Sequence, residues 1–238
     1  MRKREPDVTE NRLLGTLTST DLALLAGHLE PVRLRRGTVL VHPHEPIESA
    51  WFLTSGLSSI VAPCPNTSGV EVGMTGRDGM IGISLLLDSD RSPHSASMQA
   101  DGAGFRIDAP VLARTLAGSA SIQRHLLRYV HALCVQQGHT ALSNAIHSVE
   151  QRLARWLLMA HDRQDGDGIA MTHEFMALAL GVRRPSVTIA LHSLEGIGLL
   201  KATRGLVLIR DRQGMETFAQ TAYSTPEAEY NRLIGPSR

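Results

Sequence analysis

Residues 171–200 read Met171-Thr-His-Glu-Phe-Met-Ala-Leu-Ala-Leu-Gly181-Val-Arg-Arg-Pro-Ser-Val-Thr-Ile-Ala-Leu-His-Ser-Leu-Glu195-Gly-Ile-Gly-Leu-Leu200. This stretch predicts two short helices around a tight turn. Thr172 can cap the first helix, because its hydroxyl can accept a hydrogen bond from a backbone N–H of the first turn. Gly181 can adopt the left-handed conformation that ends a helix. Pro185 is tolerated in the first turn of the second helix, where its missing N–H would have no partner anyway.

The second helix has one apolar face and one polar face. Val187, Ala190, Leu191 and Leu194 recur at spacings of three and four, so they should face the core. Arginine and small polar groups then face outward, which suits a helix that enters the major groove of DNA. Together with two residues of the following segment, the residues expected to contact DNA are Thr172, Arg183, Arg184, Pro185, Ser186, Thr188, Ile189, His192, Lys201 and Arg204.

The segment after the second helix predicts a β-hairpin. Two apolar runs between Leu199 and Arg212 are joined by Arg204-Gly205, so the hairpin would form a wing with a basic tip that meets phosphate. From Arg183 to Arg212 there are six bases and two acids, a local net charge of +4 in a chain of net charge +1. Such a local charge on a nearly neutral chain is typical of a nucleic-acid interface.

The composition is that of a globular protein. The 238 residues are 42% apolar and 20% charged, and the chain is long enough to bury a core. No apolar run has the length of a membrane span, and the first residues hold no apolar secretion segment, so we expect a cytoplasmic protein without a membrane partner. Cys64 and Cys134 are too few for a four-thiolate cluster, and we expect neither a metal site nor a disulfide.

The middle of the chain predicts an antiparallel β-roll or barrel. Short apolar runs alternate with turn residues, and such spacing is typical of this architecture. The predicted strands are 32–34, 38–42, 50–54, 57–62, 70–75, 80–83, 95–100 and 104–107.

Helical periodicity flanks this region. A short helix should begin near Asp21, another after Asp108, and a long helix should run from Ser121 to Ile146. A stripe along the long helix steps by four and three, as in a coiled coil, and predicts a dimer interface. Its members are Ile122, Leu126, Tyr129, Leu133, Gln136 and Thr140. The alternative is a helix packed on its own domain.

These patterns together predict an α+β chain with five parts. Residues 1–19 should form a mobile terminus, 20–118 a sensor roll and 119–147 the dimerisation helix. Residues 148–223 should form a winged helix-turn-helix domain, opened by a capping box at Ser148-Val-Glu-Gln151, and 224–238 a tail.

The ordered set of motifs resembles the Crp–Fnr family of bacterial transcription regulators. It covers roughly residues 20–215 and rests on Arg36-Gly37-Thr-Val-Leu, Glu45-Pro46-Ile-Glu48-Ser-Ala-Trp51-Phe52-Leu, Ser55-Gly56, Asp78-Gly79-Met-Ile81-Gly82, Val149-Glu-Gln-Arg-Leu-Ala-Arg-Trp-Leu-Leu158 and residues 180–200. The resemblance implies a non-enzymatic homodimer that binds a twofold-symmetric DNA site. It also implies RNA polymerase as a partner and a sensor domain open to a small effector, with a pocket formed by Gly82, Ile83, Ser84, Arg91, His94, Ser95, Gln136 and Thr140.

Several departures limit what carries over from the family. Members that bind cAMP hold the ribose with a Gly-Glu-Leu and the phosphate with an Arg-Ser-Ala; here these are Gly82-Ile83-Ser84 and His94-Ser95-Ala96. Without the carboxylate and the guanidinium we expect no cAMP binding, although Arg91 could substitute if its loop shifted. The four cysteines of the iron–sulfur members are also missing, and we identify no cofactor.

The recognition helix departs as well. The Arg, Glu and Arg by which cAMP-type members recognise bases correspond to Arg184, Pro185 and Ile189. Arg184 can still donate to a guanine, whereas Pro185 has no acceptor for a cytosine amine and Ile189 offers only apolar contact. The DNA sequence recognised should therefore differ from that of those members.

Two other interpretations remain open. His42, His44 and Glu48, followed by Gly56, resemble the first motif of a cupin-type metal-binding enzyme, but a second motif with a further histidine is missing. A protein that has lost DNA binding is the other alternative, and Arg184 with the basic wing argues against it.

Overall fold

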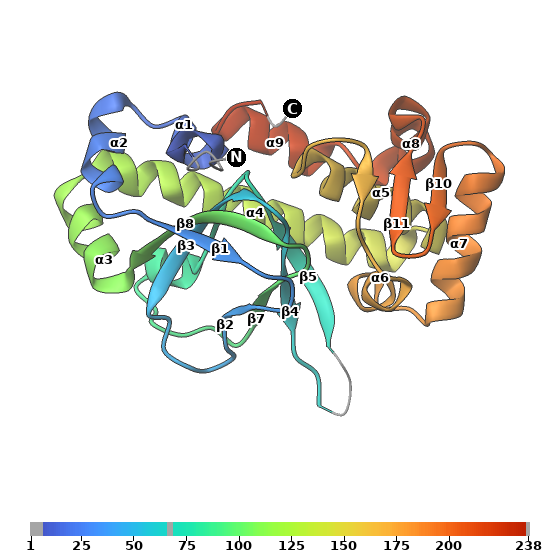
Figure 1. The fold of residues 1–238 in the computed structure, drawn as a ribbon, viewed down its shortest axis with the longest axis horizontal. Coiled ribbons are helices and arrows are strands. Elements are labelled where there is room, and N and C mark those ends of the chain that lie inside the picture. Colours follow the sequence, from blue (N-terminus) through green and yellow to red (C-terminus); the bar gives the residue numbers. More distant parts are fainter. Residues whose placement is uncertain (1–6, 66–68, 237–238) are drawn as a thin grey trace, which may run out of the picture.

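The computed structural model describes residues 7–65 and 69–236 and contains the predicted β-roll. Two four-stranded antiparallel sheets, with orders β1-β8-β3-β6 and β2-β7-β4-β5, face each other (Figure 1). All eight predicted strands are confirmed. They are β1 Glu30–Leu34, β2 Val39–Val41, β3 Ser49–Ser55, β4 Ser58–Ala62, β5 Val70–Thr75, β6 Met80–Ile81, β7 Ser95–Met98 and β8 Gly102–Asp108.

Apolar side chains fill the space between the two sheets. Leu40, Leu53, Ile81 and Met98 are among the buried residues of this core. Because successive strand residues point to opposite faces, alternating apolar positions are enough to supply such a core. The short helical segment η2, Ile83–Leu87, follows β6 and precedes β7 along the chain. It begins after Gly82, whose φ of 93° is in the left-handed region that favours glycine.

The long helix α4, Ala120–Ile146, packs along the roll. Gly79 makes the close approach possible, because a Cβ there would fall 2.1 Å from the ring of Tyr129 on α4. The side-chain amide of Gln136 forms two hydrogen bonds with the backbone of β5, as a neighbouring strand would. Its Oε1 accepts from the Met74 N–H at 2.8 Å, and its Nε2 donates to the Met74 carbonyl at 3.2 Å.

The predicted dimer stripe of this helix is therefore wrong. Ile122, Leu126, Tyr129, Leu133 and Gln136 are buried inside their own chain, and Thr140 is half-buried. The four-three spacing indicated a packed face, but that face packs on the roll and on the C-terminal helix. The opposite face of α4 is exposed in the single chain.

The N-terminal segment is structured where it is described. The segment η1, Val8–Glu10, leads into α1, Arg12–Gly15, and the following α2 spans Ser19–Ala26. Leu13 and Leu14 are fully buried, and the Asn11 amide donates to the carbonyls of Leu53 and Gly79. The prediction of a mobile terminus over 1–19 is thus wrong for residues 7–19, while residues 1–6 lie outside the described part.

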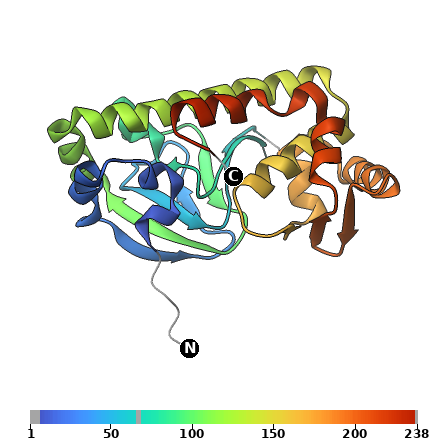
Figure 2. The same ribbon diagram turned by 90° about the horizontal axis from the view of Figure 1, so that it is seen from above.

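The C-terminal segment is a helix and not a tail. The helix α9, Thr225–Leu233, lies along α4 (Figure 2). Tyr230 donates from its hydroxyl to the Asp78 carbonyl of the roll at 2.6 Å, and Ile234 joins the same core. The chain thus returns from the helix-turn-helix domain to the roll and ties the two together. The helix α3, Ala109–Gly118, follows the roll and precedes α4.

Within the described ranges, no helix combines the length and the apolar character needed to cross a membrane.

Candidate nucleic-acid interface

The C-terminal domain contains the predicted helix-turn-helix. It begins with α5, Val149–Asp162, which carries the predicted Ser148–Gln151 capping box. The helix α6, His173–Leu180, is capped by the Thr172 hydroxyl, which accepts from the Phe175 N–H at 3.2 Å. Gly181 follows with a φ of 60°, and α7 spans Arg184–Gly196 with Pro185 in its first turn. The local chemistry of these positions produces the turn that the sequence predicts.

One face of α7 holds the domain together and the other is open. Val187, Ala190, Leu191 and Leu194 are all fully buried, as their spacing predicts. Arg183, Arg184, Pro185, Ile189 and His192 are exposed, and Ile189 retains 65% of its surface. An apolar side chain this exposed on a recognition helix is available for contact with a base methyl group.

Ser186 and Thr188 are only half-buried and differ from the other predicted contacts. The Thr188 hydroxyl donates to the Arg184 carbonyl at 3.3 Å and lies 3.1 Å from Nδ1 of His173 on α6. Thr188 therefore links the two helices of the motif as well as facing the open side.

The wing is a three-stranded sheet. The strands β10, Leu200–Thr203, and β11, Leu206–Ile209, form the predicted hairpin with Gly205 at a φ of 78°. Lys201 and Arg204 are exposed on it. The third strand β9, Gly168–Ile169, pairs with β11 and was not predicted, because two residues are too short for a periodic signal.

A groove of about 740 Å³ lies between α6, α7 and the wing. It brings together four of the predicted contacts, Thr172, Arg184, His192 and Arg204, from three elements. Glu174 and Glu195 also line it, and the sequence reading did not place these acids in the interface. Glu174 occupies the first turn of α6, where an acid is common for reasons of helix stability alone, so its position gave no distinct signal.

Arg184 is paired across the groove. Its Nε lies 3.1 Å from Oε1 of Glu174, and both side chains keep 64% of their surface. This contact links the first turns of α6 and α7.

The C-terminal domain is docked on the roll through buried polar contacts. Trp156 of α5 donates from Nε1 to the Glu71 carboxylate on β5 at 2.7 Å, and Ser59 of β4 also donates to that carboxylate. Burial raises the pKa of Glu71 to about 7, although both hydrogen bonds oppose the rise. Near the end of α5, Nη2 of Arg163 lies 2.8 Å from Oδ2 of Asp78 on the roll.

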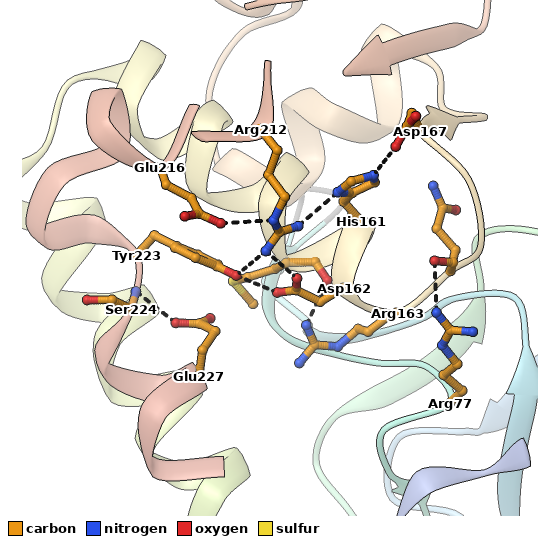
Figure 3. A network of polar contacts seen from close by, with 12 residues as sticks. Arg77, His161, Asp162, Arg163, Asp167, Arg212, Glu216, Tyr223, Ser224 and Glu227 are labelled. Carbon is orange, nitrogen blue, oxygen red and sulfur yellow. Dashed lines mark hydrogen bonds and ion pairs between the residues drawn. The ribbon is translucent and has the colours of Figure 1, made fainter. Parts of the chain in front are cut away.

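A second polar cluster surrounds the end of α5 within the C-terminal domain (Figure 3). Arg212, at the start of α8 (Arg212–Ala219), donates to the Asp162 carboxylate and to the Tyr223 hydroxyl at 2.7 and 2.8 Å. Tyr223 in turn donates to Asp162 at 2.7 Å. The segment η3, Gln220–Ala222, joins α8 to this tyrosine and so to α9. The cluster fixes the exit of the chain toward α9.

The predicted effector residues fall into separate places. Gln136 lines a cavity of about 30 Å³ beside Arg163 and Tyr230, and Thr140 lines one of about 10 Å³ beside Glu71. The six roll residues of that prediction line neither cavity. Arg91 lies on an exposed loop, where it donates to the His44 carbonyl at 3.3 Å.

The cupin alternative finds no support. Among the described residues, no group of three or more His, Cys, Asp or Glu side chains is arranged to hold a metal ion. His42, His44 and Glu48 are exposed, and both cysteines are exposed thiols.

Comparisons with known proteins agree with this architecture. Residues 151–218 match the family described as the Crp-like helix-turn-helix domain. The chain is 26% identical over 200 residues to the CRP-like cAMP-activated global transcriptional regulator of Mycobacterium tuberculosis, covering 81% of this chain and 89% of that protein. FixK2 from Bradyrhizobium japonicum superposes with a TM-score of 0.71 at 16% identity, over 82% of this chain and 99% of that one. A CRP-family transcriptional regulator from Thermus thermophilus gives 0.66 at 18% identity, over 79% and 96%.

Fold, interface and relatives define a DNA-binding transcriptional regulator. Its residues 151–218 belong to the Crp-like helix-turn-helix family, and the chain as a whole is similar to regulators of the Crp–Fnr family.

Proposed function

We propose that the chain acts as a homodimer that binds a twofold-symmetric DNA site by inserting α7 into the major groove, and that it acts by binding and not by catalysis. The observation that carries this proposal is the groove between α6, α7 and the wing, with Arg184 and Arg204 on its walls. A dimer would present two such faces to successive half-sites. RNA polymerase is the further partner proposed for a bound regulator.

Arg184 is proposed to recognise a base, and Lys201 and Arg204 to contact phosphates. Arg184 is the first residue of α7, and the N-terminal residues of a recognition helix reach the base edges. Lys201 and Arg204 lie on the wing that flanks this helix. Thr172, Arg183, Pro185, Ser186, Thr188, Ile189 and His192 complete the proposed interface.

The first prediction concerns this division of roles. Arg184→Ala should cost roughly 1–3 kcal/mol per half-site and relax the preference at one base pair. Arg204→Ala should weaken binding to all sequences alike and lower the salt slope by about one unit per subunit. The measurement is binding to a site selected from a random DNA pool and to a scrambled site, at several salt concentrations. Loss of preference in Arg204→Ala but not in Arg184→Ala would reverse the assignment, and two silent variants would remove the helix-turn-helix as the DNA face.

The dimer is proposed to form through the outward face of α4, in place of the stripe that the sequence suggested. This face carries Leu127, Cys134, Gly138, Ala141 and Leu142, all exposed in the single chain. Leu127, Cys134 and Ala141 repeat every seven residues, the period of a coiled coil. Glycine and alanine among them allow two helices to approach closely.

The second prediction is that Leu127→Asp with Leu142→Asp produces a folded monomer. The two carboxylates would be buried against their symmetry mates, which costs several kcal/mol. Light scattering should give the mass of one chain for this variant and of two chains for the unchanged protein. The matched control is Leu87→Asp, because Leu87 is also an exposed leucine but lies on the roll. A monomeric unchanged protein at micromolar concentration would contradict the proposal.

The effector is proposed to be a compound other than cAMP, with no resident cofactor. The mycobacterial relative is a cAMP-activated regulator, which makes cAMP the first compound to test. Ile83 corresponds to the ribose-binding carboxylate of the cAMP-binding members, and His94 corresponds to their phosphate-binding guanidinium.

The third prediction is that calorimetry detects no saturable cAMP binding up to about 1 mM, the range of weak complexes. A ribose hydroxyl buried against Ile83 would lose its water without a new partner, at a cost of about 1–3 kcal/mol. A micromolar dissociation constant would overturn this reading. In that case Arg91→Ala shows whether the exposed Arg91 loop has moved to supply the cation.

A further inference from the structure

The acid Glu174 stands on the DNA face, where a carboxylate would ordinarily repel phosphate. It lines the groove between the two helices and the wing, and its Oε1 lies 3.1 Å from Nε of Arg184. We propose that Glu174 is a positioning residue for Arg184: it holds the guanidinium by Nε and so presents the two terminal nitrogens to a guanine. This inference rests on the proposed role of α7 in DNA recognition.

The geometry of the pair suits this role. A guanidinium has five N–H donors, one on Nε and four on the two terminal nitrogens. A carboxylate at Nε therefore leaves the terminal pair for the O6 and N7 acceptors of guanine, which arginine contacts as a fork. Among the residues that the structure describes, Glu174 is the one ion-pair partner of the Arg184 guanidinium.

The pair does little for folding. Both side chains retain 64% of their surface, and ion pairs that are this exposed contribute little to stability. An effect of Glu174 on DNA binding can consequently be measured without a change in the fold. The pair does restrict the Arg184 side chain. A long arginine side chain loses conformational entropy when it binds a base, and the loss is smaller if an ion pair already holds the side chain.

The first turn of α6 is itself held against α7. Nδ1 of His173 lies 3.1 Å from the Thr188 hydroxyl, which also donates to the Arg184 carbonyl. This contact sits beside the Glu174–Arg184 pair and fixes the spacing of the two helix starts. Glu174 therefore acts from a fixed backbone.

Glu174 also disfavours the wrong binding mode. If Arg184 turned to a phosphate, the carboxylate would remain unpaired next to the DNA backbone, and like charges placed together are costly. When Arg184 contacts a guanine, the ion pair is kept. The acid thus lowers non-sequence-specific binding more than binding to the correct site.

The test compares Glu174→Ala with Glu195→Ala. Both variants remove one negative charge from the same groove, and no described residue forms an ion pair with Glu195. Both should bind all sequences somewhat more tightly because phosphate repulsion falls. Only Glu174→Ala should lower the preference for guanine over the other bases at the Arg184 base pair, by roughly two- to tenfold as for contacting residue pairs. The sites are variants of a sequence selected by the unchanged protein, and equal thermal unfolding confirms that the fold is kept.

The double variant separates this inference from the proposed function. In an Arg184→Ala background, Glu174→Ala should have no further effect on preference. If Arg184→Ala relaxes the preference but Glu174→Ala leaves it unchanged, Glu174 is not a positioning residue and the role of Arg184 stands. If Glu195→Ala relaxes it as much as Glu174→Ala, a charge effect replaces positioning. If Arg184→Ala leaves the preference intact, both the inference and the proposed base contact are overturned.

Discussion

Replacing Asp78 by alanine should lower the free energy of unfolding by about 3–5 kcal/mol, the loss typical of a broken buried ion pair. Oδ2 of Asp78 lies 2.8 Å from Nη2 of Arg163, and both side chains are buried. Oδ1 of Asp78 accepts from the Gly76 N–H at 2.8 Å, which holds the turn before β6. Removal of the carboxylate thus leaves a buried guanidinium without its roll partner and a backbone donor without its acceptor.

The loss should fall on the contact between the two domains, because Arg163 directly follows α5 and Asp78 belongs to the roll. Burial lowers the pKa of Arg163, and Asp78 and Asp162 raise it. Because a guanidinium is not deprotonated in proteins, Arg163 remains a cation when Asp78 is gone. Urea unfolding followed by circular dichroism measures the effect. The matched control is Asp165→Ala, because Asp165 pairs with Arg77 across the same two domains but its side chain is 89% exposed. That variant should change stability by less than about 1 kcal/mol; equal losses in the two variants would contradict the argument.

Local chemistry made the helix-turn-helix and the roll predictable. Thr172, Gly181 and Pro185 each set the local backbone conformation largely by themselves. In the structure each of them occupies its predicted position. The strands of the roll were recognisable because glycines and other turn residues separate short apolar runs. In both cases the information lies within a few residues along the chain.

The hydrophobic periodicity predicted which face of α4 is buried but not which part of the protein covers that face. Ile122 and Leu126 have the spacing of a coiled coil, yet they contact their own roll and not a second chain. A single sequence cannot distinguish these cases, because an apolar stripe shows only that something covers it. The same limit explains the C-terminal helix: the role of Tyr230 becomes visible only beside Asp78, 152 residues earlier in the chain.

The sequence predicted the basic residues of the candidate site but not its acidic ones. Arg184 and Arg204 stood out because positive charge at a recognition helix and on a wing indicates phosphate and base contact. Glu174 did not stand out, since its pairing with Arg184 depends on the angle between α6 and α7. Distant polar contacts such as Trp156 to Glu71, 85 residues apart, are likewise set by the docking of whole domains.

Glu71 provides the last prediction, a stability that falls as the pH rises. Glu71 lies on β5 with its carboxyl group buried against Ser59 and Trp156, and burial raises its pKa from 4.5 to about 7. The folded chain therefore keeps a proton that the unfolded chain releases between these values. The stabilising contribution is complete below pH 4.5 and is lost as the pH rises through about 7. A shift of this size corresponds to about 3 kcal/mol, taken as an upper value.

Glu71→Gln should remove this dependence. The amide oxygen still accepts from Trp156 and the group stays neutral, so the variant should be more stable than the unchanged protein at about pH 8 and similar to it near pH 5. Urea unfolding across this range gives the difference between the two stabilities, which cancels the other titrating groups. The matched control is Glu48→Gln at an exposed glutamate of the same roll, whose curve should run parallel to that of the unchanged protein. A Glu71→Gln difference that stays constant from about pH 5 to about pH 8 would show that the buried carboxyl does not titrate in this range.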